Sequence, residues 1–338
     1  MEALGCERLR HLGLVETGAR PRPVGTDRPP LKRQVTSNRT IKTMNKVYAI
    51  IAEVVIAKLK EGVVPWKSGR QNEMRPCNFA SKRPYRGVNW LLTTMSGFSS
   101  PYWLTKNGIL KLGGTWSGKA TKIVHWSFTY YDAKNKRVKQ TDDWVRKVPS
   151  LRYYNVWNAE QIKGIAFGTP AADDRKEHER IAAAEELVAG YVDGPTITID
   201  GSQPRYNPER DEVFNSNLDD FDTAAGFYHT LFHELGHSTG HGSRLSREGI
   251  TTRHRFGSDG YAFEELVAEL TACFLMSEAG LTADLDNSAA YIDSWIKSLE
   301  AHPDWVIKAG GLAQKAVERI VPSLAYSPEE ATEEAAAA

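Results

Sequence analysis

The sequence predicts an α+β protein of two domains, an N-terminal one that mixes helices with strands and a C-terminal one that is mostly helical. Its 338 residues are enough to bury two hydrophobic cores. Strand-like alternation of apolar residues occurs in the first half, whereas helical spacing dominates the second. The balance of basic and acidic residues changes sign at about the same place. Residues 62–152 hold 17 Lys and Arg against 4 Asp and Glu, and residues 153–338 hold 14 against 32, although the formal net charge is only +1.

The first 43 residues are rich in Pro and Arg and show little apolar periodicity, so we predict that residues 1–43 form a disordered leader. Met44 stands directly before the first convincing helical pattern, and a start codon assigned too far upstream would account for the leader. Apolar residues recur at helical spacing over 44–60, and Gly62 and Pro65 then act as stop signals.

The rest of the first domain, which we place at 44–168, reads mainly as strands. A short helix is expected at 104–112, before two glycines. Alternation over 120–131 predicts a strand with Trp126, Phe128 and Tyr130 on one face. A polar turn at 132–136 offers a hairpin into 137–148, and 153–157 reads as a further strand.

The run 169–174 marks a boundary, and a second domain is expected at 174–322. Its expected helices and strands are listed here in chain order: helix 174–190, strand 196–199, strand 211–214, helix 223–239, helix 260–279, helix 288–300 and helix 304–320. Pro322 stops the last helix, and 323–338 reads as an acidic, disordered tail.

Several protein classes are excluded by composition. No apolar run approaches the ~18 residues that a membrane-spanning helix needs, and the N-terminus does not resemble a signal peptide. The three cysteines are far apart, form no CxxC pair and suggest no disulfide framework. We therefore expect a cytoplasmic protein without a membrane partner.

The most specific motif is His233-Glu234-Leu235-Gly236-His237 within the expected helix 223–239. Residues four apart lie on one helix face, so both imidazoles can bind one zinc ion. Glu234 stands where its carboxylate can accept a proton from water that zinc activates, as the general base of a metallopeptidase. The alternative is a surface helix that happens to carry histidines, but the helical context and caps of this segment make that interpretation weaker.

A third zinc ligand must come from elsewhere. The metzincin pattern fails, because it requires His where this chain has Ser243. The gluzincin pattern ExxA fits Glu265-Leu266-Val267-Ala268, so we predict Glu265 as the third ligand. Glu269, one turn later, is expected to accept a hydrogen bond from a ligand histidine. Glu264 and Asp259 are weaker ligand candidates, and the whole acidic cluster could instead be a solvated helix face.

Other polar residues near the motif have weaker assignments. His229 and His241 extend the four-residue spacing, but each step drifts by about 40°, so we interpret them as polar residues of the helix face rather than ligands. His241, Arg244 and Tyr261 are candidates for stabilising an oxyanion, and the sequence does not choose among them.

The first domain interleaves aromatic and basic residues, which is typical of proteins that stack bases and follow the backbone of single-stranded nucleic acid. The predicted DNA-binding residues are Trp66, Lys67, Arg75, Lys82, Arg83, Tyr85, Arg86, Trp103, Lys106, Lys119 and Lys122. The alternative is that the aromatic residues form an ordinary core and the cations only aid solubility. The strong positive balance favours nucleic acid.

Several N-terminal motifs are characteristic of one protein family, namely Glu61-Gly62-Val63-Val64-Pro65-Trp66, Pro84-Tyr85-Arg86-Gly87-Val88-Asn89, Trp103-Leu104-Thr105, Tyr154-Asn155-Val156-Trp157-Asn158 and Glu160-Gln161-Ile162-Lys163-Gly164. The C-terminal ones are 233–241, 243–245, 256–258 and 261–270. Through these motifs the chain resembles the ArdC family of plasmid and phage antirestriction proteins, which pair a single-stranded-DNA-binding domain with a zincin-like metallopeptidase domain. The match covers about 44–320. Trp157 replaces a common Phe, and Asn215 stands where the family often has Pro.

This resemblance implies a protein that protects incoming single-stranded DNA, or that acts on host proteins attacking it. Two alternatives stay open. The zinc site could be structural in a protein that merely coats DNA, or the protein could be a genome-maintenance protease like the Spartan-like zincins. The sequence does not indicate the oligomeric state.

Overall fold

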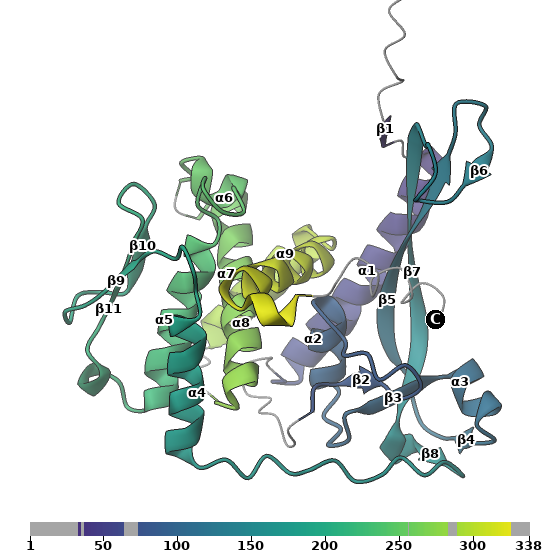
Figure 1. Ribbon diagram of the computed structural model, residues 1–338, viewed down its shortest axis with the longest axis horizontal. Helices are drawn as coiled ribbons and strands as arrows, with labels where there is room; N and C mark the ends of the chain where they lie inside the picture. Colours follow the sequence, from purple (N-terminus) through teal and green to yellow (C-terminus); the bar gives the residue numbers. More distant parts are fainter. Residues whose placement is uncertain (1–32, 35–36, 64–73, 256, 283–288, 326–338) are drawn as a thin grey trace, which may run out of the picture.

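The computed structural model describes residues 33–34, 37–63, 74–255, 257–282 and 289–325, and it confirms the α+β prediction (Figure 1). The N-terminal half is built on a six-stranded sheet with strand order β2-β3-β7-β5-β6, and β1 also pairs with β7. The C-terminal half is mostly helical. Within the described residues, no helix has the length and apolar character to cross a membrane.

The sheet is dominated by two long antiparallel strands, which form a hairpin that projects from the body of the molecule (Figure 1). The bounds of its strands are β1 Arg33–Gln34, β2 Cys77–Asn78, β3 Tyr102–Thr105, β5 Thr121–Tyr131, β6 Arg137–Val138 and β7 Arg146–Asn158. The predicted hairpin is confirmed, but its long return strand is β7, because 137–138 forms only the two-residue β6. A separate pair joins β4 (Thr115–Trp116) to β8 (Ile162–Lys163).

Three helices accompany this sheet, namely α1 (Asn38–Lys60), α2 (Val88–Thr94) and α3 (Lys106–Lys111). Helix α1 begins before Met44, because the Ser37 side chain caps it by accepting a hydrogen bond from the backbone N–H of Thr40. The prediction of disorder is therefore wrong for 38–43, whereas residues 1–32 lie outside the described part of the chain. Helix α2 was not expected from the sequence.

The C-terminal half follows the expected order, with end points that differ from the predictions by a few residues. Its helices are α4 Glu177–Ala189, α5 Ala224–Ser238, α6 Glu248–Thr251, α7 Asp259–Ala279, α8 Ala289–Ala301 and α9 Trp305–Ile320. Its strands β9 (Thr196–Ile199), β10 (Arg205–Asn207) and β11 (Glu212–Asn215) form a small sheet of order β10-β11-β9. The sequence interpretation missed α6 and β10, and most of the expected acidic tail, 326–338, is not described.

The largest hydrophobic core spans both halves, contrary to the expectation that each half buries its own core, and two smaller clusters lie within the N-terminal half. A continuous cluster of buried side chains runs from α1 and α2 into α5, α7 and α9. The rings of Trp90 in α2 and Phe274 in α7 meet edge to face with centroids 4.7 Å apart. An ion pair of 2.7 Å between Arg75 and Glu278 also crosses the boundary. Helix α7 is thereby buried along most of its length.

Two glycines allow the halves to approach this closely. A Cβ atom on Gly310 of α9 would lie 2.8 Å from the backbone nitrogen of Val88, and one on Gly87 would lie 2.9 Å from the carbonyl oxygen of Gly310. Gly87 also has φ +53°, a conformation that side chains rarely adopt. By contrast, a Cβ on the neighbouring Gly311 meets nothing within 4 Å.

These neighbours give a matched stability test. Gly310→Ala is expected to lower the free energy of unfolding by about 1–3 kcal/mol, because the added methyl group must displace the backbone of α2. Gly311→Ala should raise it by up to about 1 kcal/mol, because Ala favours a helix and the site is open. Urea unfolding followed by circular dichroism measures both, and equal effects would contradict the close contact.

Candidate metal centre

Helices α5 and α7 bring the three predicted ligand residues together. The Nε2 atoms of His233 and His237 are 3.1 Å apart, one turn from each other on α5. The Glu265 carboxylate reaches across from α7, with its two oxygens 3.4 Å from His233 Nε2 and 3.5 Å from His237 Nε2. All three ligand atoms lie within 4.8 Å of one another.

Small residues on both helices make this approach possible. A Cβ atom on Gly236 of α5 would lie 3.2 Å from the Cα and carbonyl oxygen of Ala268 in α7. Gly236 is the small residue inside the histidine motif, and Ala268 is the last residue of the ExxA motif. Larger side chains at either position would push the helices apart and move Glu265 away from the histidines.

Carboxylates on α7 hold the outer nitrogens of both histidines. Glu269 Oε2 lies 3.2 Å from His233 Nδ1, as predicted, and Glu264 Oε1 lies 3.4 Å from His237 Nδ1. The other oxygen of Glu269 is 3.1 Å from His229 Nε2, so this carboxylate stands between two histidines. A carboxylate on Nδ1 fixes the ring orientation and leaves Nε2 directed at the metal position.

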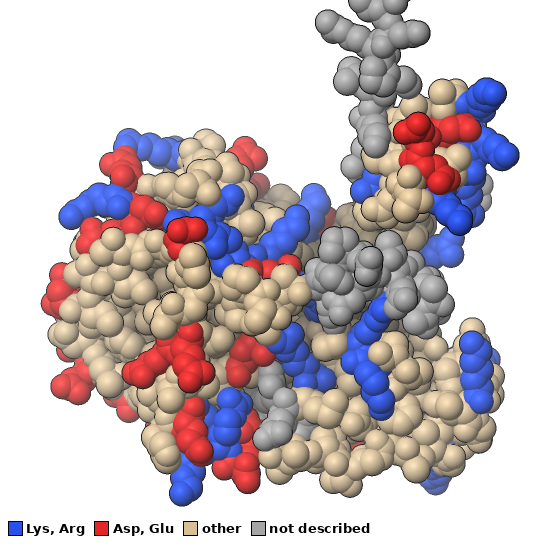
Figure 2. Space-filling view, viewed as in Figure 1, with Lys and Arg blue, Asp and Glu red and all other residues tan. Residues whose placement is uncertain are grey.

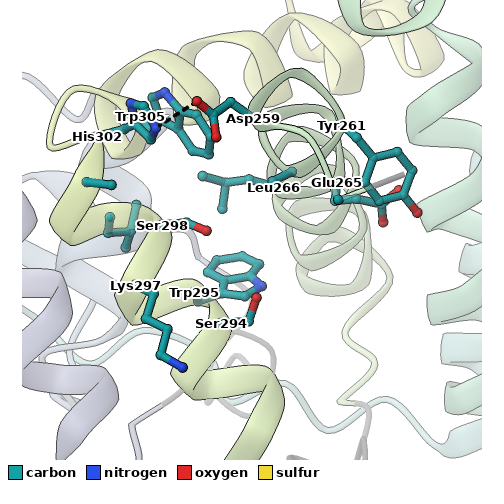
Figure 3. Close-up of a pocket in the computed structure, with 14 residues that line it drawn as sticks. Asp259, Tyr261, Glu265, Leu266, Ser294, Trp295, Lys297, Ser298, His302 and Trp305 are labelled. Carbon is teal, nitrogen blue, oxygen red and sulfur yellow. Dashed lines mark ion pairs between the residues drawn. The ribbon is translucent and has the colours of Figure 1, made fainter. Parts of the chain in front are cut away.

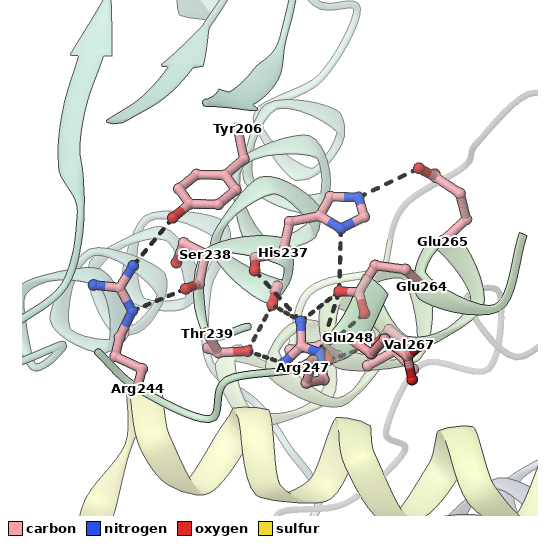
Figure 4. A network of polar contacts seen from close by, with 12 residues as sticks. Tyr206, His237, Ser238, Thr239, Arg244, Arg247, Glu248, Glu264, Glu265 and Val267 are labelled. Atoms are coloured by element: carbon pink, nitrogen blue, oxygen red, sulfur yellow. Dashed lines mark hydrogen bonds and ion pairs between the residues drawn. The ribbon is translucent and has the colours of Figure 1, made fainter. Parts of the chain in front are cut away.

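A buried arginine completes the network behind His237 (Figure 4). Arg247 binds Glu264 through Nη2 at 2.5 Å and Nε at 3.1 Å, and both side chains are about 5% exposed. The same guanidinium donates to the carbonyl oxygen of Gly236 at 2.8 Å and to the hydroxyl of Thr239 at 2.5 Å. Arg247 therefore caps the C-terminal end of α5 and compensates the buried charge of Glu264.

A second arginine holds the same end of α5 from the other side. The Nε of Arg244 donates to the carbonyl oxygen of Ser238 at 2.8 Å, and its other nitrogens bind Asp211 and the hydroxyl of Tyr206. These contacts tie the helix to the small sheet (Figure 4). Arg244 is thus a structural residue and not the oxyanion-stabilising group that the sequence left open.

The histidines and carboxylates of this centre shift one another's pKa values. Burial acts to lower the pKa of His233, but hydrogen bonds to Glu265 and Glu269 outweigh it and raise that pKa to about 10. For Glu265 burial acts to raise the pKa, yet its hydrogen bonds with His233 and His237 hold it well below the ordinary value. The carboxylates are therefore ionised, as metal ligands and their supports must be.

These residues fit a divalent metal ion. Two imidazole nitrogens and one carboxylate converge on one point, and both rings are oriented by carboxylates on their far sides. The donor set of two histidines and one glutamate is the one that catalytic zinc uses in metallopeptidases, where the fourth position stays open for water or substrate.

Two further side chains belong to the open side of the centre. Glu234 is 9% exposed and follows the first histidine on α5. Tyr261 lies one turn before Glu265 on α7, and its pKa is raised to about 12 by burial, by the nearby charge of Glu265 and by its hydrogen bond to Glu265. Its hydroxyl therefore stays protonated at neutral pH and can donate. His241, in contrast, bonds with Ser243 on the surface.

The structure also corrects the weaker assignments around the motif. His229 is 3% exposed and faces Glu269, so it is a buried partner and not a residue of a polar helix face. Glu264 supports His237 instead of lying on a solvated face. No sequence motif marks Arg247. The only available signal was that a buried glutamate beside a ligand histidine requires a cation.

Several predicted DNA-binding residues lie inside the protein. Trp103 is 1% exposed and Tyr85 is 7% exposed, and both belong to one core cluster. Their interpretation as base-stacking side chains is therefore wrong, because a base cannot reach the ring faces. Arg75 and Arg86 pair with Glu278 and Glu318 of the C-terminal half.

The remaining predicted residues differ in position. Lys82, Lys106 and Lys119 are exposed, and Lys122 lies over the ring of Tyr153 at 5.9 Å. Arg83 is partly buried beside Tyr85. Trp66 and Lys67 lie outside the described residues.

The exposed aromatic residues are found on the projecting hairpin instead. Trp126 and Phe128 of β5 are 37% and 40% exposed, and their rings stack with centroids 6.3 Å apart and planes 13° apart. The ammonium group of Lys147, on β7, lies 3.8 Å from the centroid of Phe128. We call Trp126, Phe128 and Lys147 the hairpin cluster. Figure 2 shows basic side chains along this hairpin with an acidic group near its end, and acidic side chains mixed with basic ones over the C-terminal half.

Comparisons with known proteins agree with this architecture. The family described as the N-terminal domain of anti-restriction factor ArdC matches residues 45–157, and the family of zincin-like metallopeptidases matches residues 182–311. The chain is 32% and 33% identical to two Escherichia coli proteins named DNA primase TraC, over 79% and 78% of its length. It spans only 19% and 26% of those relatives.

Solved structures show a closer correspondence in length. The metal-free crystal structure of antirestriction ArdC protein from plasmid R388 superposes with a TM-score of 0.62 at 28% identity, covering 82% of this chain and 97% of that one. The Mn(II)-bound structure of the same protein superposes with a TM-score of 0.62 at 29% identity, covering 82% of this chain and 98% of that one. With both domain families matched in order and the metal-centre residues in place, the chain belongs to the ArdC family of antirestriction proteins.

Proposed function

We propose that this protein is a metal-dependent peptidase that binds single-stranded DNA and protects incoming DNA by acting on proteins associated with it. The convergence of His233, His237 and Glu265 on one point, with Glu234 beside them, carries the peptidase part. The exposed hairpin cluster and the basic character of the N-terminal half support the DNA part. The donor set of two imidazoles and one carboxylate favours zinc, and the buried thiols Cys77 and Cys273 favour a cytoplasmic site of action.

The chemistry follows from the positions of the side chains. A bound zinc ion would supply Lewis acidity at the point where the three ligands converge. Glu234 would accept the proton of the attacking water and deliver it to the leaving amine. The Tyr261 hydroxyl, protonated at neutral pH, would exchange its hydrogen bond to Glu265 for one to the developing oxyanion. Glu264 and Glu269 keep both histidines oriented while these steps occur.

Glu234→Gln is the decisive test of the peptidase proposal. We expect it to lower the rate of protein cleavage by about 10²–10⁴-fold, because general-base catalysis contributes that much. Metal content should stay at the wild-type level, because Glu234 is not a ligand. Purified wild type and variant are compared by metal analysis and by cleavage of DNA-binding proteins, with and without an oligonucleotide. Unchanged cleavage in a metal-loaded variant would refute the assignment.

The DNA part of the proposal predicts which aromatic residue matters. Trp126→Ala should weaken binding of a single-stranded oligonucleotide by about 1–3 kcal/mol without affecting the fold, because this ring is 37% exposed and can contact a base beside Phe128. Affinity should also fall steeply as salt increases. Fluorescence anisotropy measures both effects. The matched control is Trp116→Ala, because that ring already packs against Trp157 with centroids 5.2 Å apart. Equal losses in the two variants would argue against the hairpin cluster as the binding surface.

A further inference from the structure

A large cavity reaches the metal centre at Glu265 and Tyr261. It has a volume of about 590 Å³ and is bounded by the N-terminal half of α7, helix α8 and the start of α9 (Figure 3). That volume is in the range of pockets that bind small molecules or side chains. Glu265 and Tyr261 line it, so the cavity and the metal centre share a metal ligand and the candidate oxyanion donor.

The inner surface of this cavity is mainly apolar. Leu266 and Leu299 are 6% and 1% exposed, and Trp305 is 9% exposed. Trp295 of α8 presents its ring to the same space (Figure 3). A ligand group that fills this region is expected to be mainly apolar, because a charged group would lose its hydration against these apolar side chains.

Charged groups stand at the exposed rim, whereas the hydroxyl group of Ser298 lies among the apolar residues (Figure 3). His302 stacks on Trp305 with ring centroids 4.2 Å apart and planes 6° apart, and its Nε2 atom is 3.3 Å from the carboxylate of Asp259. Lys297 also lines the cavity and is exposed to solvent. A mainly apolar interior with a polar rim is the arrangement of a pocket that accepts an apolar side chain while the main chain stays outside.

We propose that this cavity binds a large apolar side chain, aromatic or branched aliphatic, from the residue of a polypeptide substrate that lies next to the scissile peptide bond. This inference rests on the proposed peptidase function, because it places the scissile carbonyl group at Glu234 and Tyr261. A side chain that projects from there toward Glu265 enters the cavity between Leu266 and Trp295. Burial of such a side chain should favour it over alanine by about 10-fold or more.

Peptide hydroxamates test the pocket without requiring cleavage. Isothermal titration calorimetry is carried out on the metal-loaded, full-length Glu234→Gln protein, with a pair of hydroxamates that carry either a benzyl or a methyl side chain. We expect the benzyl compound to bind at least about 10-fold more tightly. Equal affinities, or no binding of either compound, would overturn the proposal.

Variants that fill the cavity provide the structural control. Ser298→Phe and Ser294→Phe add a ring within the lining of α8 and should abolish the preference for benzyl, while Asp293→Phe, exposed and outside the lining, should keep it. Persistence of the preference in both filled variants, with circular dichroism spectra like wild type, would contradict the assignment. Displacement of the benzyl compound by a short oligonucleotide would likewise overturn it in favour of a nucleobase.

Cleavage of a peptide library separates the pocket from the proposed function. Wild-type protein should cut peptides with Phe, Tyr, Trp or Leu beside the cleaved bond in preference to Gly or Asp. Cleavage without any such preference would be consistent with the peptidase proposal but would contradict the assignment of the cavity as a side-chain pocket. Benzyl-selective binding without any cleavage would support the side-chain preference of the cavity and contradict the peptidase proposal.

Discussion

Replacing Arg247 with Met is expected to lower the free energy of unfolding by about 3–5 kcal/mol, because it leaves the carboxylate of Glu264 buried without a cation. The change also removes the donors that cap the carbonyl groups of Gly236 and His237 at the end of α5. Metal affinity should fall together with stability, since Glu264 also orients His237. Chemical denaturation of the metal-free protein isolates the first effect, and a chelator competition isolates the second.

Two controls distinguish this mechanism from a general loss of charge. Arg253 forms an ion pair with Glu209 on the surface, where its side chain is 94% exposed, so Arg253→Met should change stability by no more than about 1 kcal/mol. The double variant Arg247→Met, Glu264→Met removes both buried charges and should be more stable than Arg247→Met alone. If Arg247→Met and Arg253→Met have equal effects, the buried pair does not support α5 in the way described.

Helical spacing explains why the convergence of these three side chains could be predicted from the sequence. His233 and His237 had to share a face because they are one turn apart, and the ExxA pattern identified Glu265 among several acidic neighbours. Glu269 followed from the same face of α7. The role of Glu264 could not be predicted, because it depends on Arg247, which reaches the site from a loop whose path no local pattern specifies.

The exposed aromatic residues were harder to predict for a different physical reason. Aromatic density does not distinguish a core from a binding surface, and Trp103 proved to be core. Val124 and Trp126 share one face of β5, yet Val124 is 7% exposed and Trp126 is 37% exposed. Asn89 of α2 bonds both backbone groups of Val124, so that helix covers the strand there and leaves the outer part of the hairpin open. Only the tertiary structure shows where this cover ends.

Replacing Glu269 with Gln is expected to weaken metal binding by about 10–100-fold, although Glu269 is not a ligand. Its two carboxylate oxygens lie 3.2 Å from His233 Nδ1 and 3.1 Å from His229 Nε2, and a glutamine side chain offers only one acceptor oxygen. One histidine must then face an amide NH₂ group, and the negative charge that makes His233 a stronger ligand is lost.

Glu265 and Glu269 of α7 should contribute unequally to metal affinity. Glu265→Gln removes a ligand and should weaken metal binding more than Glu269→Gln, whereas His241→Ala, on the surface beside Ser243, should leave it unchanged. Chelator competition measures all three affinities, and circular dichroism confirms that each variant is folded. Wild-type affinity in Glu269→Gln would mean that the ring of His233 is oriented by helix packing alone. A metal affinity of Glu269→Gln between those of wild type and Glu265→Gln would show that the buried chain from His229 through Glu269 to His233 contributes to the affinity of the metal centre.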